Sequence, residues 1–204
     1  RDGESAGHPR RWWVLAVLCL SLFLVVVDNT IVNVALPTLS ADLDASTTQL
    51  QWIVDAYTLV FASLLLAFGH FGDRFGRRGA LALGLVLFGA TSALAAFATS
   101  AGALIGVRAL MGVGAALVFP ATLAILMNVF TDKKQRAAAI GIWSGATGMA
   151  VAAGPVAGGF LLEHFWWGSV FLVNVPIVVL AVVAVMAVVP TSKDPNSGRL
   201  DWFG

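Results

Sequence analysis

Three side chains that can carry a charge interrupt long apolar stretches of the sequence: Asp28, Asp55 and Arg108. A charge is costly in lipid, so an ionisable residue inside a membrane segment usually marks an ion or substrate pathway. Desolvation favours the protonated form of a carboxyl group, whereas a neighbouring guanidinium favours the carboxylate. A carboxyl group balanced between these influences can exchange protons as water reaches it from different sides. The pattern therefore predicts proton exchange, with a structural ion pair as the alternative for Arg108.

The three groups are predicted to lie at similar depth in the outer half of a membrane. At a rise of about 1.5 Å per residue, Asp28, Asp55 and Arg108 fall ~12, ~10 and ~8 Å from the outer ends of their helices. Asn33 follows on the segment of Asp28, and Trp52 lies beside the face of Asp55. We expect all five residues to bind protons or substrate around an internal cavity. The alternative for Asp55 is hydration at the outer interface.

The composition indicates that lipid, rather than water, surrounds the elements that carry these groups. Of 204 residues, 59% are hydrophobic and 11% are charged, against about a quarter charged in soluble domains. This excludes a soluble enzyme domain, a disordered tail and a nucleic-acid-binding module, since a net charge of +1 attracts phosphate weakly. The single cysteine excludes a disulfide framework and a cysteine zinc site. Catalytic and phosphate-binding motifs are absent from the sequence, so we expect no enzyme, no metal and no cofactor.

Uncharged windows predict an all-α, polytopic membrane protein with six spanning helices. We expect spans at about residues 11–36, 48–70, 79–99, 103–129, 137–162 and 167–190, between a tail at 1–10 and a linker at 191–204. Eleven of the twelve lysine and arginine residues lie at the two chain ends and in the second and fourth connections. Because positively charged connections stay on the cytoplasmic side, both ends are predicted to be cytoplasmic in a multi-pass protein of the cell membrane.

The second connection carries a dense pattern of glycine, acid and arginine. Its residues are Gly69, Gly72, Asp73, Arg74, Gly76, Arg77 and Arg78. The segment is short enough to require a tight turn, for which Gly72 and Gly76 supply unusual backbone angles. Asp73 is placed to stabilise a helix N-terminus, and the arginines to reach carbonyl groups or acidic partners. A plain cytoplasmic anchor is the alternative, but it explains the arginines and not the alternation of glycine, aspartate and arginine.

Small residues recur at four-residue spacing in the fifth predicted span. Gly141 and Gly145 form one pair. The second group is Gly154, Pro155, Gly158 and Gly159. Small residues let two helix backbones approach closely, and proline bends a helix. The second group therefore predicts a tightly packed or flexible contact, with generic helix packing as the alternative.

Ordered motifs along the chain resemble those of the major facilitator superfamily. Residues 69–78 resemble its loop between spans two and three, with Phe71 in place of leucine. Residues 108–114 resemble its span-four motif, with Met111 where glutamine is frequent, and residues 150–159 look like its antiporter motif, with Ala150 in place of the leading glycine. The stretches 28–37, 52–57 and 171–176 are similar to fourteen-span drug:proton antiporters of the QacA/EmrB type.

This resemblance implies that the six spans are the N-terminal bundle of a transporter, and that residues 191–204 lead to a missing seventh span. It implies proton coupling or cation binding at Asp28, a substrate path near Asp55, a proton relay at Arg108 and a conformational lock in the loop of Asp73. The expected function is proton-driven multidrug efflux by alternating access. The proton gradient would supply the energy, and the expected partners are the lipid bilayer, drug-like small molecules and the missing C-terminal bundle. The alternatives are a narrow-specificity antibiotic or metabolite exporter and a truncated half-bundle that does not transport.

Overall fold

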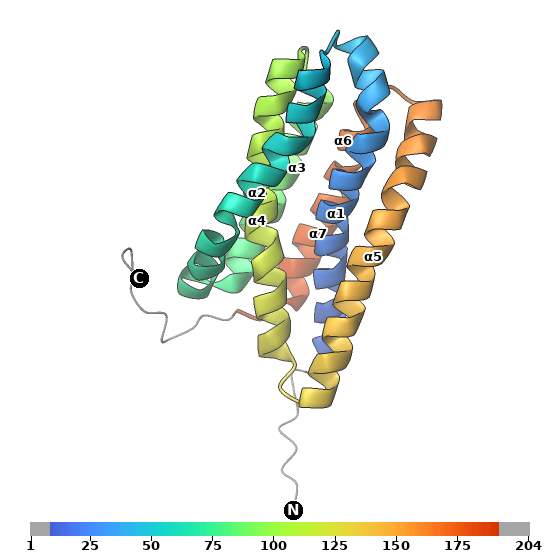
Figure 1. Ribbon diagram of the computed structural model, residues 1–204. Helices are drawn as coiled ribbons and strands as arrows, with labels where there is room; N and C mark the ends of the chain where they lie inside the picture. The colour runs from blue at the N-terminus through green and yellow to red at the C-terminus, as the bar shows by residue number, and fades with distance from the viewer. Residues whose placement is uncertain (1–8, 192–204) are drawn as a thin grey trace, which may run out of the picture.

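The computed structural model describes residues 9–191, without the side chains of Asp73 and Phe75. The predictions for residues 1–8 and 192–204 therefore lie outside the described part. Residues 9–191 are all-α, as predicted, and contain no strand (Figure 1). The helices are α1 (Arg11–Asp42), α2 (Thr47–Phe75), α3 (Arg77–Ala96), α4 (Ala101–Val129), α5 (Lys133–His164), α6 (Ser169–Leu172) and α7 (Asn174–Val188).

Six helical segments are long and apolar enough to span a membrane, which is the predicted number, and the sixth is Ser169–Val188, formed by α6 and α7 together. The break between α6 and α7 falls at Val173, although that residue keeps helical backbone angles (φ −60°, ψ −26°). Pro176 lies three residues further on, and its ring nitrogen has no hydrogen to donate to the carbonyl of Leu172. The missing hydrogen bond explains why the helix is interrupted there.

The first helix is longer than its predicted span. α1 continues from residue 36 through Pro37 to Asp42, so the first connection is reduced to residues 43–46. Leu39 is fully buried, and its packing stabilises the additional turns. The next helix begins at a capping box, in which Gln49 N donates to Ser46 Oγ at 3.3 Å and Ser46 N donates to Gln49 Oε1 at 3.0 Å.

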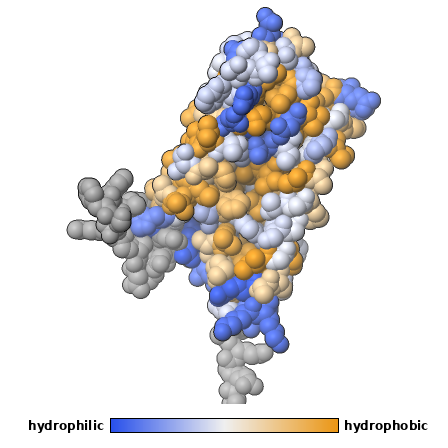
Figure 2. Space-filling model, in the orientation of Figure 1, coloured by the Kyte–Doolittle hydropathy of each residue, from blue (hydrophilic) through white to orange (hydrophobic). Residues whose placement is uncertain are grey.

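The helices do not pack in chain order. α1 packs mainly against α5, α2 packs against α4, and α3 contacts both α4 and α7 (Figure 1). α1, α3 and α4 are the most buried spans, whereas α2 and α5 are the least buried. Figure 2 shows apolar side chains over the middle of the visible face and hydrophilic residues gathered at both ends. This distribution suits a body whose middle contacts lipid and whose ends contact water.

Glycine permits close contacts between helices, including those of α4 with α2 and of α5 with α1. A Cβ atom at Gly112 of α4 would lie 2.6 Å from the carbonyl oxygen of Tyr57 on α2. A Cβ atom at Gly154 of α5 would lie 2.7 Å from Cβ of Thr30 on α1, and one at Gly158 would lie 2.9 Å from Cγ1 of Ile31. These contacts hold α4 close to α2 and α5 close to α1.

Candidate functional site

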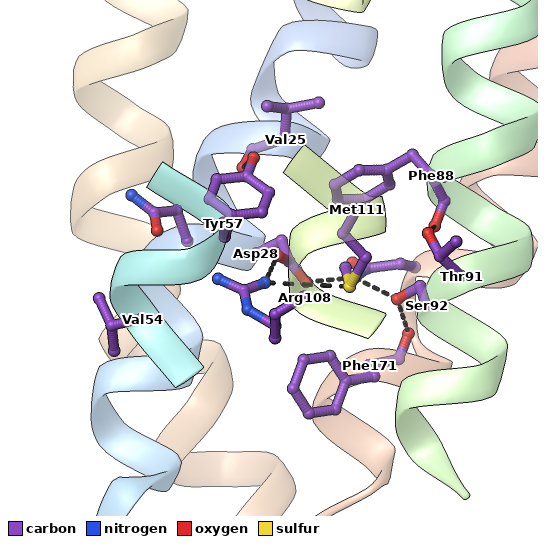
Figure 3. Close-up of polar contacts among 12 residues, drawn as sticks. Val25, Asp28, Val54, Tyr57, Phe88, Thr91, Ser92, Arg108, Met111 and Phe171 are labelled. Carbon is purple, nitrogen blue, oxygen red and sulfur yellow. Dashed lines mark hydrogen bonds and ion pairs between the residues drawn. The ribbon is translucent and has the colours of Figure 1, made fainter. Parts of the chain in front are cut away.

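Asp28 on α1 and Arg108 on α4 form an ion pair inside the bundle (Figure 3). Nη1 of Arg108 lies 2.5 Å from Oδ2 of Asp28, and both side chains are fully buried. The structure therefore brings together two of the three predicted ionisable residues. A buried charge is tolerated when it is paired and hydrogen-bonded, and here each charge satisfies the other.

Arg108 is also held from α2. Its Nε donates a hydrogen bond to the carbonyl oxygen of Ile53 at 3.1 Å, and its guanidinium carbon lies 4.3 Å from the centre of the Tyr57 ring. The Tyr57 hydroxyl in turn donates to the carbonyl oxygen of Val25 on α1, at 3.3 Å. The remaining nitrogen of Arg108, Nη2, is buried without a hydrogen-bond partner. The guanidinium thus has anchors on α2 that do not involve Asp28.

The other oxygen of Asp28 is bound by an amide. Nδ2 of Asn174, at the start of α7, donates to Oδ1 of Asp28 at 2.8 Å and to Oγ of Ser92 on α3 at 2.9 Å. Oγ of Ser92 donates to the carbonyl oxygen of Phe171 at 2.8 Å (Figure 3). Asn174 is 1% exposed and Ser92 is fully buried. Both oxygens of the Asp28 carboxylate therefore accept hydrogen bonds from buried donors.

Three residues of this network were not predicted as site residues: Tyr57, Ser92 and Asn174. Each is a polar group in an apolar span, where polar side chains tend to hydrogen-bond across helices. The signal was strongest at Asn174, which is the only amide side chain between residues 136 and 195. Tyr57 and Asn174 lie in the stretches 52–57 and 171–176, which resemble the drug:proton antiporters. That resemblance assigned no role to either side chain.

Asp55, Asn33 and Trp52 lie outside the network. Asp55 is partly exposed, and the contacts of the described residues do not join it to Asp28 or Arg108. It lies two residues from Ile53, about 200° around the helix, so it faces away from the side of α2 that packs on α4. Asn33 is exposed and donates to the carbonyl oxygen of Asn29 at 3.1 Å, and Trp52 is 49% exposed. The expected meeting of two carboxylates with one guanidinium is therefore not found.

A small cavity lies beside the network. It has a volume of about 190 Å³ and is lined by Val25, Val26, Asn29, Tyr57, Thr58, Phe61 and Phe119. Tyr57 contributes to both places, because its ring contacts Arg108 and also lines the cavity. Phe61 stacks on Tyr57 with ring centres 6.3 Å apart and contacts Phe119 edge to face at 5.8 Å. Oδ1 of Asn29, another lining residue, is buried without a hydrogen-bond partner. The lining therefore combines three aromatic rings with aliphatic and polar side chains.

The loop between α2 and α3 is a single residue. Gly76 has φ 116° and ψ 122°, angles that favour glycine, so the predicted tight turn is found there. Gly69 and Gly72 lie inside α2, so the expectation of unusual backbone angles at Gly72 is wrong: the helix continues through it to Phe75.

The arginines of this loop reach backbone carbonyls, as predicted. Nη1 of Arg77 donates to the carbonyl oxygen of Ala124 at 3.4 Å, and Nη1 of Arg78 to that of Val189 at 3.3 Å. Arg74 is exposed at the end of α2. The side chain of Asp73 lies outside the described part, so its predicted role stays a prediction.

The glycine pairs of α5 differ from one another. Gly154 and Gly158 are buried against α1, whereas Pro155 and Gly159 are exposed. A Cβ atom at Gly141 or Gly145 would meet no atom within 4 Å. The second group therefore forms the close contact that was predicted, and the first pair lies on an open face of α5.

Comparisons with known proteins agree with these features. Residues 18–203 match the sequence profile of the Major Facilitator Superfamily. The chain is similar to the "Multidrug efflux pump LfrA" of Mycolicibacterium smegmatis, with 50% identity over 95% of this chain and 38% of that protein. It is also similar to the "Methyl viologen resistance protein SmvA" of Salmonella typhimurium, with 45% identity over 94% of this chain and 38% of that protein.

A third relative is the "Puromycin resistance protein pur8" of Streptomyces alboniger, with 41% identity over 96% of this chain and 39% of that protein. The chain thus spans about two fifths of the length of these three relatives. Among residues 9–191, leaving out the side chain of Asp73, no group of three His, Cys, Asp or Glu residues is placed to hold a metal ion.

Proposed function

The chain belongs to the major facilitator superfamily, and from this premise we propose that it is the N-terminal part of a proton-coupled drug exporter. The observation that carries the proposal is the buried Asp28–Arg108 pair, which lies against an aromatic cavity through the shared ring of Tyr57. A proton-exchanging group next to a substrate cavity is what exchange of a proton for a drug requires. The names of the three relatives, which refer to multidrug efflux, methyl viologen resistance and puromycin resistance, support the same function.

In the proposed cycle, Asp28 takes up a proton on one side of the membrane and releases it on the other. Alternating access of water to the buried pair couples these steps to the movement of substrate. The proton gradient supplies the energy, so the chain uses no cofactor and catalyses no chemical reaction. The loop of Asp73, Gly76 and the neighbouring arginines is proposed to stabilise one of the two conformations, since Arg77 and Arg78 connect it to α4 and to the segment after α7.

The proposed substrates are apolar, often cationic, small molecules. Tyr57, Phe61 and Phe119 present aromatic surface to the cavity, and aromatic faces attract organic cations. The missing C-terminal bundle would complete the substrate path. A narrow-specificity antibiotic or metabolite exporter is the alternative, since the name of one relative refers to puromycin alone. A half-bundle that does not transport is the second alternative.

We place the protein in the cell membrane with both chain ends in the cytoplasm. Exposed aromatic residues support two membrane interfaces, because tryptophan and other aromatic side chains gather at the boundary of lipid and water. Trp12 and Trp13 are 47% and 71% exposed at the start of α1, and Phe165 and Trp166 are 55% and 49% exposed after α5. The cationic connections lie at the same end of the bundle as Trp12, and this end is the proposed cytoplasmic side.

Efflux of a cationic dye from cells that express the full-length protein tests this function. Asp28→Asn keeps the size of the side chain but removes the proton-exchanging group, so efflux should fall to the level of cells without the protein. Asp42→Asn is the matched control, because it makes the same change at an exposed position on the same helix, and it should keep wild-type efflux. Wild-type, pH-dependent efflux by Asp28→Asn at equal membrane expression would contradict the proposal.

A further inference from the structure

The hydrogen-bond chain that ends at Asp28 has a fixed direction. A serine hydroxyl has one hydrogen, and Ser92 donates it to the carbonyl oxygen of Phe171. Ser92 Oγ must therefore accept from Asn174, which identifies the group facing it as the amide nitrogen Nδ2. Nδ2 has two hydrogens, and the second points to Oδ1 of Asp28. The orientation of the Asn174 amide is thus set by the backbone through Ser92.

This direction restricts where Asp28 can carry a proton. Oδ1 faces a hydrogen of Asn174, and Oδ2 faces a hydrogen of Arg108. Each carboxyl oxygen has two lone pairs, so a protonated oxygen still accepts a hydrogen bond, but the proton removes the negative charge that strengthens both contacts. The arrangement therefore fits the carboxylate form of Asp28, and protonation weakens the contact at the oxygen that takes the proton.

The contact with Arg108 is the easier one to break. Arg108 keeps the carbonyl oxygen of Ile53 and the ring of Tyr57 as partners after it leaves Asp28. Asn174 has no second anchor of this kind for the hydrogen that faces Asp28, because its other hydrogen is bound to Ser92. Oδ1 therefore stays occupied while Oδ2 becomes free.

We propose that Asn174, held by Ser92, is a positioning residue that reserves Oδ1 of Asp28 and directs the incoming proton to Oδ2, so that proton uptake and release of Arg108 are one event. This inference rests on the proposed function and adds two residues to it. Proton binding would then loosen the contact between α1 and α4 each time it occurs. Without Asn174, the proton could bind at Oδ1 and leave the Arg108 contact intact.

The ionisable groups that face Asp28 are few. α4 contributes Arg108 and α2 contributes Tyr57, while the contacts from α3 and α7 are the neutral Ser92 and Asn174. α5 also packs against α1, but its ionisable residues lie only at its two ends: Lys133, Lys134, Arg136, Glu163 and His164. A change in the titration of Asp28 after substitution of Asn174 therefore reports on this network.

The test is an infrared titration of the purified full-length protein in liposomes, in which the carboxyl band missing from Asp28→Asn is followed with pH. Asn174→Leu removes a donor to the charged form, so the Asp28 band should appear at a pH about one unit higher than in the wild type, as expected for a hydrogen bond to a charged group. Ser92→Ala leaves Asn174 in place without its support and should give a smaller shift in the same direction. Asn128→Leu, at an exposed amide on α4, should titrate like the wild type.

An unchanged titration in folded Asn174→Leu or in Ser92→Ala would overturn the proposal, and the second variant decides it if the first does not fold. Efflux of ethidium from the same liposomes separates this inference from the function on which it rests. Failure of the wild type to transport ethidium or any other cationic dye would count against drug export, whereas the infrared titration would still decide the role of Asn174. Rescue of the wild-type midpoint by Asn174→Gln would support an amide donor over a purely structural role.

Discussion

Arg108 is stable inside the bundle because its charge is paired and two of its three side-chain nitrogens, Nε and Nη1, have partners. Asp28 supplies the countercharge, and Ile53 and Tyr57 supply a carbonyl oxygen and an aromatic face. A buried ion pair often contributes little net stability, but removal of one partner leaves an uncompensated charge, which costs far more. The two residues are therefore coupled, because the charge of Asp28 determines how costly it is to keep Arg108 buried.

A double-mutant cycle tests this coupling. Arg108→Met leaves the Asp28 carboxylate without its countercharge, and it should lower the stability of the full-length protein by about 3–5 kcal/mol. Asp28→Asn with Arg108→Met removes both charges and should be more stable than Arg108→Met alone. Thermal unfolding in detergent measures the effect. Strictly additive losses in the double variant would show that the two residues do not act as a pair.

Sequence reasoning found the charged half of the network and missed the neutral half. Asp28 and Arg108 were predictable because a charge in an apolar segment is costly wherever it lies. Asn174 was not, because its role depends on a contact 146 residues away along the chain, which only packing reveals. Asp55 was expected to lie near Asp28 because both carboxyl groups were predicted at a similar depth. The sequence does not tell which side of α2 faces α4, so it did not show that Asp55 points away. A single sequence can indicate that a charged group lies within a membrane span. It does not identify the residues from other helices that the group contacts.

At the scale of helices, the distance between α2 and α4 controls the site, because Tyr57 and Ile53 reach Arg108 across that contact. Gly112 permits the approach at the backbone of Tyr57. The number of helices was predictable from uncharged windows. Their ends were not, because the extra turns of α1 after Pro37 depend on the packing of Leu39 rather than on local preference.

Gly112→Ala should therefore separate α2 from α4. The new methyl group would lie 2.6 Å from the carbonyl oxygen of Tyr57, so the helices must move apart, at a cost of about 1–3 kcal/mol. Dye efflux should fall with thermal stability. Gly106→Ala is the control, since Gly106 is an exposed glycine on the same helix with no atom within 4 Å. It should be neutral or slightly stabilising because alanine favours a helix, and equal behaviour of the two variants would contradict the close contact.

At the scale of the whole molecule, the first three spans and the last three are interlocked. α1 packs on α5 and α2 packs on α4, so each early helix finds its main partner in the later half of the chain. The α1–α5 contact passes through Gly154 and Gly158, and the α1–α4 contact includes the Asp28–Arg108 pair. A shift of α5 against α1 therefore moves the helix that carries Asp28.

Gly154→Ala tests that connection. A methyl group at Gly154 would lie against Thr30, two residues from Asp28, and should displace α1 from α5. We expect the folding free energy to fall by about 1–3 kcal/mol, which lowers thermal stability. Dye efflux should become slower as well. Gly148→Ala, on the open face of the same helix, should keep both near wild type. Loss of efflux by Gly148→Ala to the same extent would point to α5 itself rather than to its contact with α1.

The separation of Asp28 from its countercharge also has a consequence for biogenesis. Arg108 follows Asp28 by 80 residues, and at a synthesis rate of about 5–20 residues per second it emerges about 4–16 s later. During that interval α1 enters the bilayer with an acidic residue that has no partner, at a cost of about 2.5–3.5 kcal/mol near the bilayer centre. The hydrophobic residues on either side of Asp28 must outweigh this cost until the later helices arrive. Insertion of the nascent chain therefore relies on an apolar first helix, and the ion pair is completed only after the fourth helix has been made.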